Sequence, residues 1–366
     1  MELLGIWFAV CGVSFESVGD GAVPEGEAKS VGDDATAGRR VTSADVAREA
    51  GVSRATVSYI LNGTGNQPIR ESTRRRVLDA ARTLGYTPSA AARTLRRGRS
   101  DLVVCLLPDF PMGPTLGGFL HDLTECFAAR AMTFVIYPVP DGASSARLWK
   151  ALSPAALIGL AAFRDEDAEL FESLGLPVAE VVYGTVHHKL PQVILPNNLF
   201  GRLQAEYLAG RGHQRLGYAY PDDARLALFA EPRLAGVRQA CQELNLPAPV
   251  TCKVGWDPDS ARAALRAWLG AEVPVTAVCA YNDEVALALL SAAREMGIRV
   301  PGDLAVIGVD DIPLAALGHP ALTTVSTNLR PYAEQLAELI VAAVNGKYAP
   351  CPAITEQPRV VVRDST

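Results

Sequence analysis

The sequence predicts an all-α N-terminal helix-turn-helix headpiece followed by an α/β body of two doubly wound subdomains. Three observations lead to this fold class. Residues 41–62 have the apolar spacing of two short helices joined at a glycine. From about residue 101 onward, short apolar runs alternate with helical stretches, as in parallel α/β sheets. About 265 residues of such alternation are enough for two subdomains.

The first helix is expected to begin at Thr42, which is a good N-cap residue, with Asp45 three positions later to complete a capping-box pair. Apolar residues between positions 46 and 50 give this helix one buried stripe. Gly51 is expected at the turn, because glycine adopts positive φ without steric cost. Ser53 then caps a second helix.

The second helix has two different faces. Val57, Ile60 and Leu61 are expected to pack on the first helix. The opposite face carries Arg54, Ala55, Thr56, Ser58 and Tyr59. Short polar side chains beside arginine and tyrosine suit the DNA major groove, where base edges offer donors, acceptors and thymine methyl groups. An ordinary helical hairpin is the alternative that the two helices alone leave open.

The distribution of charge favours DNA. The whole chain has a net charge of −6, yet residues 39–100 contain thirteen arginines, no lysine and four acidic residues, a net charge of +9. Residues 1–38 carry −6 and residues 101–366 carry −9. A compact basic segment on an acidic body is typical of a domain that binds phosphates.

A third helix is predicted over residues 71–84, ending at Gly85. Its predicted apolar stripe consists of Val77, Leu78, Ala81 and Leu84. Its arginines at positions 74, 75, 76 and 82 can reach DNA phosphates.

A short fourth helix is predicted over residues 90–97, capped by Ser89 and ended by Gly98. It is too short to be stable alone. Leu95 is its one large apolar side chain and would suit a wedge in a minor-groove step. A linker helix with this leucine docked on a neighbour is the alternative.

Residues 41–99 as a unit resemble the DNA-binding headpiece of the lactose/galactose-repressor (LacI/GalR) family. The matching positions are 41–42, 45–47, 50–53, 56–58, 61–62, 73–74, 77, 84–86, 88–89, 92–93 and 95. The resemblance implies that Arg54, Ala55 and Tyr59 read bases, and that a hinge helix pairs with its dimer mate in the minor groove. The full set of DNA-contact residues that it implies is Thr42, Ser53, Arg54, Ala55, Thr56, Ser58, Tyr59, Asn62, Thr73, Ala92, Arg93 and Leu95.

The headpiece departs from the family pattern in two places. Many family members have arginine where this chain has Tyr59, so the operator consensus of the family is not carried over to this chain. The loop before the third helix is about two residues longer, and Arg70 stands where a capping serine is common.

In the body, the first strand is predicted at residues 102–107 and is followed by a helix at 118–129. Further strands are predicted at residues 133–137, 156–161, 178–182, 215–220, 275–280 and 304–309. Ligands of open parallel sheets bind beyond the carboxyl ends of the strands, so the residues that follow these strands are candidates for a binding site.

Asn282 follows one predicted strand and Asp310 ends another. Both lie in stretches that resemble the effector-binding domain of the same family, which shares its fold with periplasmic sugar-binding proteins. The resemblance implies that Arg233, Asn282 and Asp310 are polar ligand contacts. Phe110, near the first strand end, is a candidate to stack on the ligand, although core packing is an open alternative for Phe110 and for Phe119.

Two departures make a familiar hexose effector doubtful. Tyr183 and Gly184 occupy positions where relatives often carry an acidic residue or arginine, and Asn197 stands where an aspartate is usual. A different small molecule and a weakened pocket are therefore open alternatives. The effector that we expect is a small molecule, a sugar or a related metabolite.

The expected organisation is a disordered extension at 1–38, a helix-turn-helix DNA-binding domain at 39–87, a hinge helix and linker at 88–100, and an effector-binding and dimerisation domain at 101–366. The function expected from this organisation is that of a transcriptional regulator, and specifically a repressor. Its expected partners are double-stranded operator DNA, a second copy of the chain and the effector, with no membrane. Seven scattered cysteines without metal-ligand spacing suit a reducing cytoplasm, and neither cofactor nor metal is expected.

Two other functions compete with a regulator. The α/β body would suit a solute-binding module of a transport system. The basic headpiece argues against that function, and so does the N-terminus, which lacks the basic region of an export signal. An enzyme would need a catalytic group, for which only the neighbouring Asp310 and Asp311 offer themselves; the sequence has no nucleophile elbow and no phosphate-binding loop.

Overall fold

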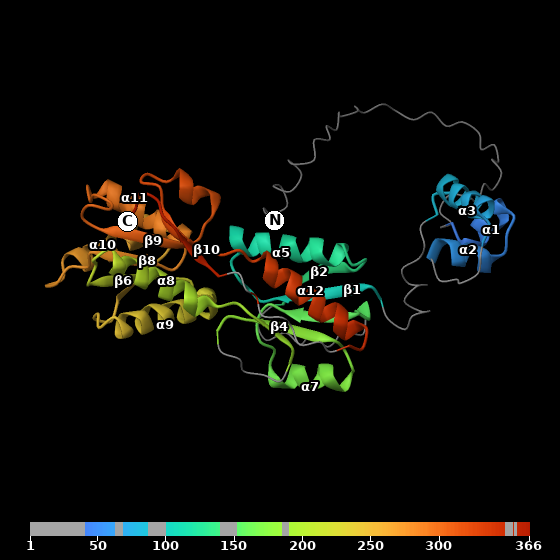
Figure 1. Cartoon of the computed structure of the whole chain (residues 1–366), viewed down its shortest axis with the longest axis horizontal. Helices are drawn as coiled ribbons and strands as arrows, with labels where there is room; N and C mark the ends of the chain where they lie inside the picture. Colours follow the sequence, from blue (N-terminus) through green and yellow to red (C-terminus); the bar gives the residue numbers. More distant parts are fainter. Residues whose placement is uncertain are drawn as a thin grey trace, which may run out of the picture. The chain divides into compact units, whose positions relative to one another are not determined.

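The computed structural model describes residues 41–62, 69–86, 100–139, 152–184, 190–347, 354 and 357–366. They form two compact units: a helical headpiece within residues 41–86 and an α/β body from residue 100 onward (Figure 1). The predicted extension at 1–38 and the predicted hinge helix at 90–97 lie outside the described residues.

The headpiece consists of α1 (Ser43–Ala50), α2 (Arg54–Asn62) and α3 (Glu71–Thr83). One apolar cluster joins the three helices, formed by Val46, Ala47, Ala50, Val57, Ile60, Val77, Ala80 and Ala81. This small core explains why helices of 8, 9 and 13 residues are stable together, although none is long enough to be stable alone.

The predicted turn between the first two helices is confirmed. The Asp45 carboxylate accepts hydrogen bonds from the backbone N–H of Thr42 at 3.0 Å and from its hydroxyl at 2.7 Å. Gly51 has φ 61° and ends α1. The hydroxyl of Ser53 accepts from the backbone N–H of Thr56 at 3.1 Å and so caps α2.

The predicted apolar stripe of α3 is wrong at one position. Leu78 is 43% exposed, whereas Val77, Ala80 and Ala81 are buried. Helix geometry explains the difference, because positions three, four and seven residues after Val77 share its face, and Leu78 lies about 100° away from it. Leu84, at the seventh position, packs against this cluster as predicted.

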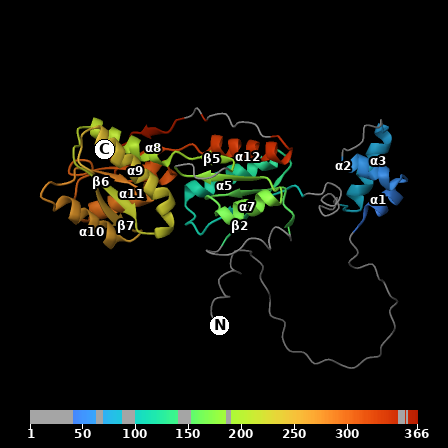
Figure 2. The same ribbon diagram turned by 90° about the horizontal axis from the view of Figure 1, so that it is seen from below.

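The body has two lobes. Lobe 1 is a parallel sheet in the order β2-β1-β3-β4-β5. Its strands are β1 (Leu102–Leu107), β2 (Thr133–Pro138), β3 (Ala156–Gly159), β4 (Val178–Val182) and β5 (Gln192–Ile194). Helices α5 (Pro114–Ala128) and α12 (Arg330–Val344) cover one face and α7 (Asp165–Ser173) covers the other (Figures 1 and 2).

Covering both faces explains why β1 is a continuous apolar run. Val103 and Cys105 belong to the cluster that includes α5 and α12, while Val104 and Leu106 pack in the cluster that includes Phe171 of α7. Successive side chains of a strand point to opposite faces, so a strand with helices on both sides is apolar throughout.

Lobe 2 is a sheet in the order β11-β10-β9-β8-β6-β7, in which only β11 runs antiparallel. Its strands are β6 (Leu216–Pro221), β7 (Val250–Val254), β8 (Ala277–Ala280), β9 (Ala305–Asp310), β10 (Thr323–Ser326) and β11 (Arg359–Val361). One face packs on α8 (Asn197–Gly210) and α9 (Ala227–Glu243), the other on α10 (Pro258–Leu269) and α11 (Asp283–Glu295). Two doubly wound subdomains are thereby confirmed.

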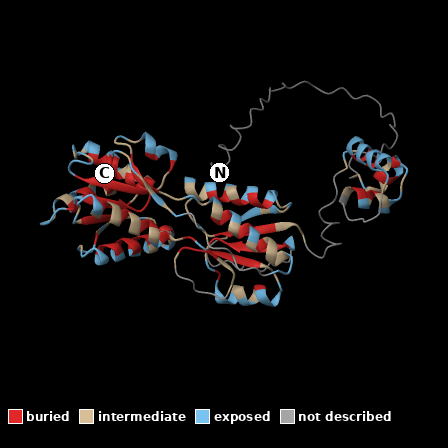
Figure 3. Cartoon of the chain, in the orientation of Figure 1, coloured by how far each residue is buried: buried red, intermediate tan, exposed pale blue. Residues whose placement is uncertain are grey.

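The chain passes between the lobes more than once. It leaves lobe 1 after β5, builds β6 to β10 of lobe 2, and returns after β10 so that α12 packs in lobe 1. It then adds β11 to the lobe 2 sheet beside β10. Tyr332, Ala333, Leu336, Ala337 and Ile340 of α12 lie in the lobe 1 core. Buried residues gather in the strands and on the inner helix faces of both lobes (Figure 3).

Candidate functional site

Helix α2 presents one face to solvent. Arg54 and Ala55 are exposed and Tyr59 is 41% exposed, while Val57 and Ile60 on the other face are buried. The three side chains that the resemblance implies as base readers therefore share the accessible side of this helix. A major groove admits a helix presented in this way.

The remaining predicted DNA-contact residues differ in their surroundings. The Ser53 and Thr56 hydroxyls lie 2.9 Å apart and are committed to the start of α2. Ser58 and Thr73 are half-buried, and Thr42 is exposed beside its Asp45 partner. Asn62 ends α2, but its side chain is outside the described part of the chain, as are Ala92, Arg93 and Leu95.

Exposed arginines surround the headpiece. Arg48 pairs with Asp45 at 3.0 Å, and Arg82 pairs with Asp79 at 3.8 Å. Arg75 and Arg76 are exposed on α3. Exposed ion pairs of this kind are weak, so these arginines can exchange a carboxylate for a DNA phosphate.

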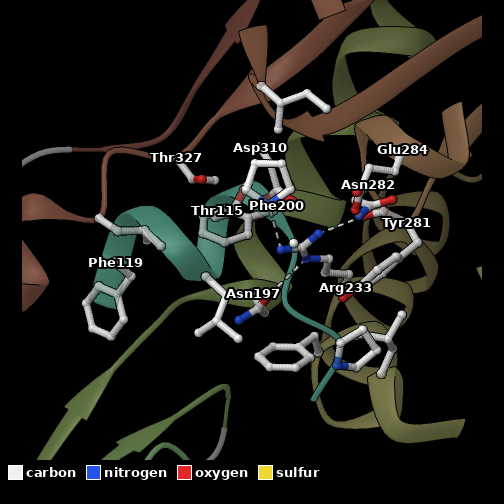
Figure 4. A pocket seen from close by; sticks show the side chains of 18 of the residues that line it. Thr115, Phe119, Asn197, Phe200, Arg233, Tyr281, Asn282, Glu284, Asp310 and Thr327 are labelled. Carbon is white, nitrogen blue, oxygen red and sulfur yellow. Dashed lines mark hydrogen bonds and ion pairs between the residues drawn. The ribbon is translucent and has the colours of Figure 1, made fainter. Parts of the chain in front are cut away.

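A second candidate site is a pocket between the two lobes of the body (Figure 4). Residues from both lobes line it, and so do the segments that cross between them: Leu195 and Asn197 at the first crossing, Thr327 and Leu329 at the second. A ligand in this pocket would contact both lobes and the connections that relate them.

Arg233 on α9 is the central polar residue of the pocket. It donates to Asn197 Oδ1 at 2.8 Å, to the carbonyl oxygen of Tyr281 at 2.7 Å and to Asp310 Oδ1 at 3.2 Å (Figure 4). Its guanidinium carbon lies 5.6 Å from the centre of the Phe200 ring and 4.9 Å from that of Tyr281. A buried cation requires this degree of pairing, and the result is a fixed side chain.

The backbone at the end of β9 directs Asp310 into the pocket. Asp310 has φ 109° and Asp311 has φ 55°, both in the left-handed region that favours glycine. Arg363 donates to the Asp311 carboxylate at 2.6 Å, and the N–H of Ile312 donates to Asp283 at 2.9 Å. These two bonds, at Asp311 and at Ile312, hold the turn, which explains how two aspartates remain in this conformation.

Asn282 both caps α11 and faces the pocket. Its Oδ1 accepts from the backbone N–H of Val285 at 3.0 Å, and its amide donates to Glu284 Oε2 at 3.0 Å. The capping role is thus present together with the predicted ligand-facing position. Burial raises the pKa of Glu284, and the Asn282 amide opposes that shift.

The surroundings of Asp310 shift the pKa of its carboxyl group in opposite directions. Burial raises the pKa of its carboxyl group, while the Arg233 guanidinium and the Thr115 hydroxyl both favour the carboxylate. Thr115 belongs to the first turn of α5 in lobe 1, so the Asp310 carboxylate contacts both lobes.

The two predicted aromatic candidates lie in different places. Phe119 lines the pocket, whereas Phe110 is not among its lining residues. The rings of Phe110 and Tyr183 both pack edge-on against the ring of Phe229. The distance between ring centres is 4.9 Å for Phe110 and 4.5 Å for Tyr183. Phe110 therefore reaches the pocket through Phe229, which does line it.

Several lining residues were missing from the predicted site: Thr115, Tyr183, Phe229, Trp256, Tyr281, Glu284 and Thr327. Position relative to the strands could have indicated some of them, since Tyr183 follows β4 directly and Tyr281 follows β8. Trp256 could not be found in this way, because it follows β7, a strand that was not predicted. Phe229 lies on α9 and meets Phe110 and Tyr183 only where the two lobes come together.

Within the described ranges, we find no group of three or more histidine, cysteine, aspartate or glutamate side chains able to hold a metal ion. The helices of those same ranges include none with the length and apolar character needed to cross a membrane.

Comparison with known proteins finds two matching families, each over a different part of the chain. The family described as "Bacterial regulatory proteins, lacI family" matches residues 42–89, and the "Periplasmic binding protein-like domain" matches residues 205–366. The first match contains α1 to α3, and the second contains Arg233, Asn282 and Asp310. Fold and sites together define a DNA-binding transcription regulator with a periplasmic-binding-protein-like body.

Individual relatives place the chain more narrowly. The transcriptional regulator CelR of Thermobifida fusca is 30% identical over 89% of this chain and 98% of its own length. The transcriptional repressor PurR of Mannheimia succiniciproducens is 29% identical over 88% of this chain and 98% of its own length. The chain belongs to the LacI family of bacterial regulators. The relatives found are transcriptional regulators and repressors rather than enzymes.

Solved structures show the same fold. A CelR–cellobiose complex has a TM-score of 0.62 at 26% identity, covering 89% of this chain and 100% of the other. The Lac repressor dimer bound to operator and the anti-inducer ONPF has a TM-score of 0.73 at 23% identity, covering 89% of this chain and 99% of the other.

Proposed function

We propose that this transcription regulator is a repressor that binds a palindromic operator as a homodimer and responds to a small-molecule effector in the interlobe pocket. The observation that carries the DNA-binding part is the exposed face of α2, with Arg54, Ala55 and Tyr59 on it, in a segment of net charge +9. One helix reads few bases, so two half-sites supply the specificity that a regulator needs.

The proposed contacts divide by role. Arg54, Ala55 and Tyr59 read base edges, while Thr42, Ser53, Thr56, Ser58, Asn62 and Thr73 contact the backbone or support the readers. Ala92, Arg93 and Leu95 act in the hinge helix at the minor groove. A protein with this DNA target acts in the cytoplasm.

The effector part is supported by the pocket and by relatives. Arg233, Asn282 and Asp310 line the pocket together, and Phe110 supports it through Phe229. A ligand between the lobes stabilises one lobe arrangement, which alters the spacing of the paired headpieces and hence operator affinity. Operator and effector affinities are then coupled reciprocally. The CelR complex with cellobiose supports a sugar or related metabolite as effector.

The decisive experiment selects bound fragments of the source genome with purified protein and titrates the best fragment with salt. A repressor dimer gives a short palindrome, high affinity and a steep fall of the binding constant with salt concentration. Weak binding that does not depend on sequence would contradict the proposal. The genes beside the selected site then indicate which effectors to test.

A further inference from the structure

Strands β8 and β9 part from each other where they reach the interlobe pocket. Their parallel pairing ends with Cys279 opposite Ile307. Each strand keeps its other neighbour for longer, since β8 pairs with β6 up to Ala280 and β9 pairs with β10 up to Asp310. Residues 280–282 and 308–310 therefore form the two arms of a fork between neighbouring strands.

Each arm of the fork ends in a polar residue of the pocket. Asn282 ends one arm and Asp310 ends the other, and both line the pocket (Figure 4). Arg233 donates to the carbonyl oxygen of Tyr281 on the first arm and to the Asp310 carboxylate on the second. The separation of the arms therefore decides whether these polar groups can contact one ligand together.

A glutamine of α8 lies at the base of the fork. Gln204 Nε2 is a hydrogen-bond donor to the carbonyl oxygens of Ala280 at 2.8 Å, Ile307 at 3.1 Å and Gly308 at 3.1 Å. The two N–H bonds of one amide are thus shared among carbonyl groups of both strands, at the point where strand pairing has ended. The amide takes over from the strand-to-strand bonds and joins the two arms.

Packing alone does not explain a glutamine at this position. Gln204 is fully buried, and Phe200, Ala205 and Leu208 of the same helix belong to an apolar cluster. Its Oε1 has no hydrogen-bond partner within the part of the chain that the structure describes. Because a buried acceptor without a partner costs free energy, an apolar side chain of similar length would serve the core better. The N–H donors are what such a side chain would lack.

Helix α8 also holds Arg233. Asn197 lies two helical turns before Gln204, and so on the same side of α8. Its Oδ1 accepts from Arg233 at 2.8 Å. One face of α8 therefore fixes both the guanidinium of the pocket and the strand ends that carry Asn282 and Asp310.

Resting on the proposed role of this pocket as the effector site, we infer that Gln204 is a positioning residue for it. The Gln204 amide holds the arms of the fork at the separation that lets Asn282 and Asp310 contact one ligand, although Gln204 does not line the pocket itself. Without the amide, the carbonyl groups of the two arms need water as a partner, and the arms move apart to admit it. Effector affinity then falls.

Hydrogen exchange on the full chain, measured by mass spectrometry, tests this role without a known effector. Gln204→Met keeps a similar length and volume and removes both N–H donors. Protection of backbone N–H groups over residues 278–284 and 306–313 is expected to fall at least about tenfold, while α10 and the headpiece stay within about twofold. Unchanged protection at the strand ends overturns the inference. An equal loss over α10 also overturns it, because lobe 2 as a whole would then be loosened.

Gln204→Glu separates hydrogen bonding from packing. Its side chain has the same shape, but the protonated carboxyl group has one O–H donor and the carboxylate has none. Burial keeps the group protonated at about pH 5, so protection at the strand ends is expected to exceed that of Gln204→Met there and to fall as the pH rises. Exchange rates at each pH are divided by those of unstructured peptides. Equal protection in the two variants at the lower pH contradicts a role for the donor.

Gln239→Met and Gln239→Glu are the matched controls. Gln239 is exposed on α9 of the same lobe and donates to Glu243 at 2.9 Å, away from the fork. Neither control is expected to change protection over residues 278–284 or 306–313. A loss in Gln239→Met as large as that in Gln204→Met would overturn the assignment of the effect to the fork.

Calorimetry on the same proteins measures the consequence for binding. The probes are the common hexoses and pentoses. Any of them that the unaltered protein binds is expected to bind at least about tenfold more weakly to Gln204→Met, and equal affinity overturns the inference. If none binds, the exchange result decides alone.

Failure of this inference is distinguishable from failure of the proposed function. Absence of operator binding would remove the repressor role and leave the exchange result as it stands. Strand ends that remain protected in Gln204→Met would remove the positioning role of Gln204, while operator binding by the unaltered protein would still support a repressor.

Discussion

Arg225 of lobe 2 pairs with Asp109 of lobe 1, with Arg225 Nη1 3.2 Å from Asp109 Oδ1. Asp223, also in lobe 2, holds the same guanidinium, with Arg225 Nη2 2.7 Å from Asp223 Oδ2. The contact lies next to the packing of Phe110 on Phe229, which also joins the lobes. An ion pair and an aromatic contact therefore connect the lobes close to the pocket.

Asp109→Asn is expected to weaken the lobe arrangement seen here. Asp109 and Arg225 are 63% and 48% exposed, so the effect on effector affinity is small, a loss of less than about fivefold that disappears at high salt. Calorimetry at two salt concentrations measures it. Glu295→Gln is the control, because Glu295 pairs with Arg262 within lobe 2; equal losses in both variants would contradict an interlobe role.

Arg54→Ala should relax operator specificity. Arg54 stands on the exposed face of α2, so its loss is expected to lower specific affinity by about tenfold or more and to equalise binding at one base position. Arg75→Ala, on the exposed part of α3, should instead weaken binding to all DNA sequences alike. It should reduce the slope of log binding constant against log salt concentration by about 1. Fluorescence anisotropy on operator and mutated operator separates them; identical behaviour would argue against a reading role for Arg54.

Leu95→Ala should weaken specific operator binding while effector binding remains. The residue is proposed to enter the minor groove, where an apolar wedge stabilises a bend. Electrophoretic mobility shift with bent and unbent fragments checks this. Equal operator affinity in the variant would remove the wedge role.

Gly236→Ala should destabilise the body. A Cβ at Gly236 would lie 1.8 Å from the carbonyl oxygen of Asn198, so α8 and α9 would have to separate. The expected loss in the free energy of unfolding is about 1–3 kcal/mol or more. Effector binding should fall too, because the Arg233–Asn197 bond joins the same two helices.

Gly210→Ala is the matched control in α8. A Cβ there would meet nothing within 4 Å, so this variant should be as stable as the unaltered protein or slightly more stable. Urea unfolding of both proteins gives the comparison. A Gly236→Ala protein of unchanged stability would contradict the close packing of α8 on α9.

Asp283→Asn should change how stability depends on pH. Burial raises the pKa of Asp283 from its ordinary value of 3.8 to about 7, although the Thr324 hydroxyl and the Ile312 N–H favour the charged form. The folded state thus holds this proton more tightly than the unfolded chain. The contribution of Asp283 to the free energy of unfolding is expected to fall by up to about 4 kcal/mol between pH 4 and 7, then level off.

In the Asp283→Asn variant this contribution should vanish, so the difference between the two stability curves should change steadily from pH 4 to pH 7 and stay constant above. The lowered carboxyl pKa values of other groups, such as Asp303 and Asp223, are common to both proteins and cancel. Denaturation at successive pH values measures the curves. Parallel curves would show that Asp283 titrates normally.

The headpiece could be predicted because its signals are local. The Thr42–Asp45 cap, the turn at Gly51 and the Ser53 cap each involve residues three or fewer positions apart, or one special φ. Leu78 was misplaced because one position decides which face of a helix a side chain joins.

The body was predicted in part. Strands covered by helices on both faces are apolar runs and were found. β7, with alternating exposure, and β10, which begins with two threonines, carry no such run and were missed, as were the three-residue strands β5 and β11. The pocket required tertiary information, because the partners of Arg233 are 36, 48 and 77 positions distant.

The path of α12 has a consequence for synthesis of the protein. The first strand of lobe 1 begins at Leu102, yet its core is completed by residues up to Ile340 of α12. On the ribosome, lobe 1 begins to emerge before lobe 2, yet α12 is made after strands β6 to β10 of lobe 2. The sheet of lobe 1 must wait, with one apolar face partly uncovered, until nearly the whole chain has been translated.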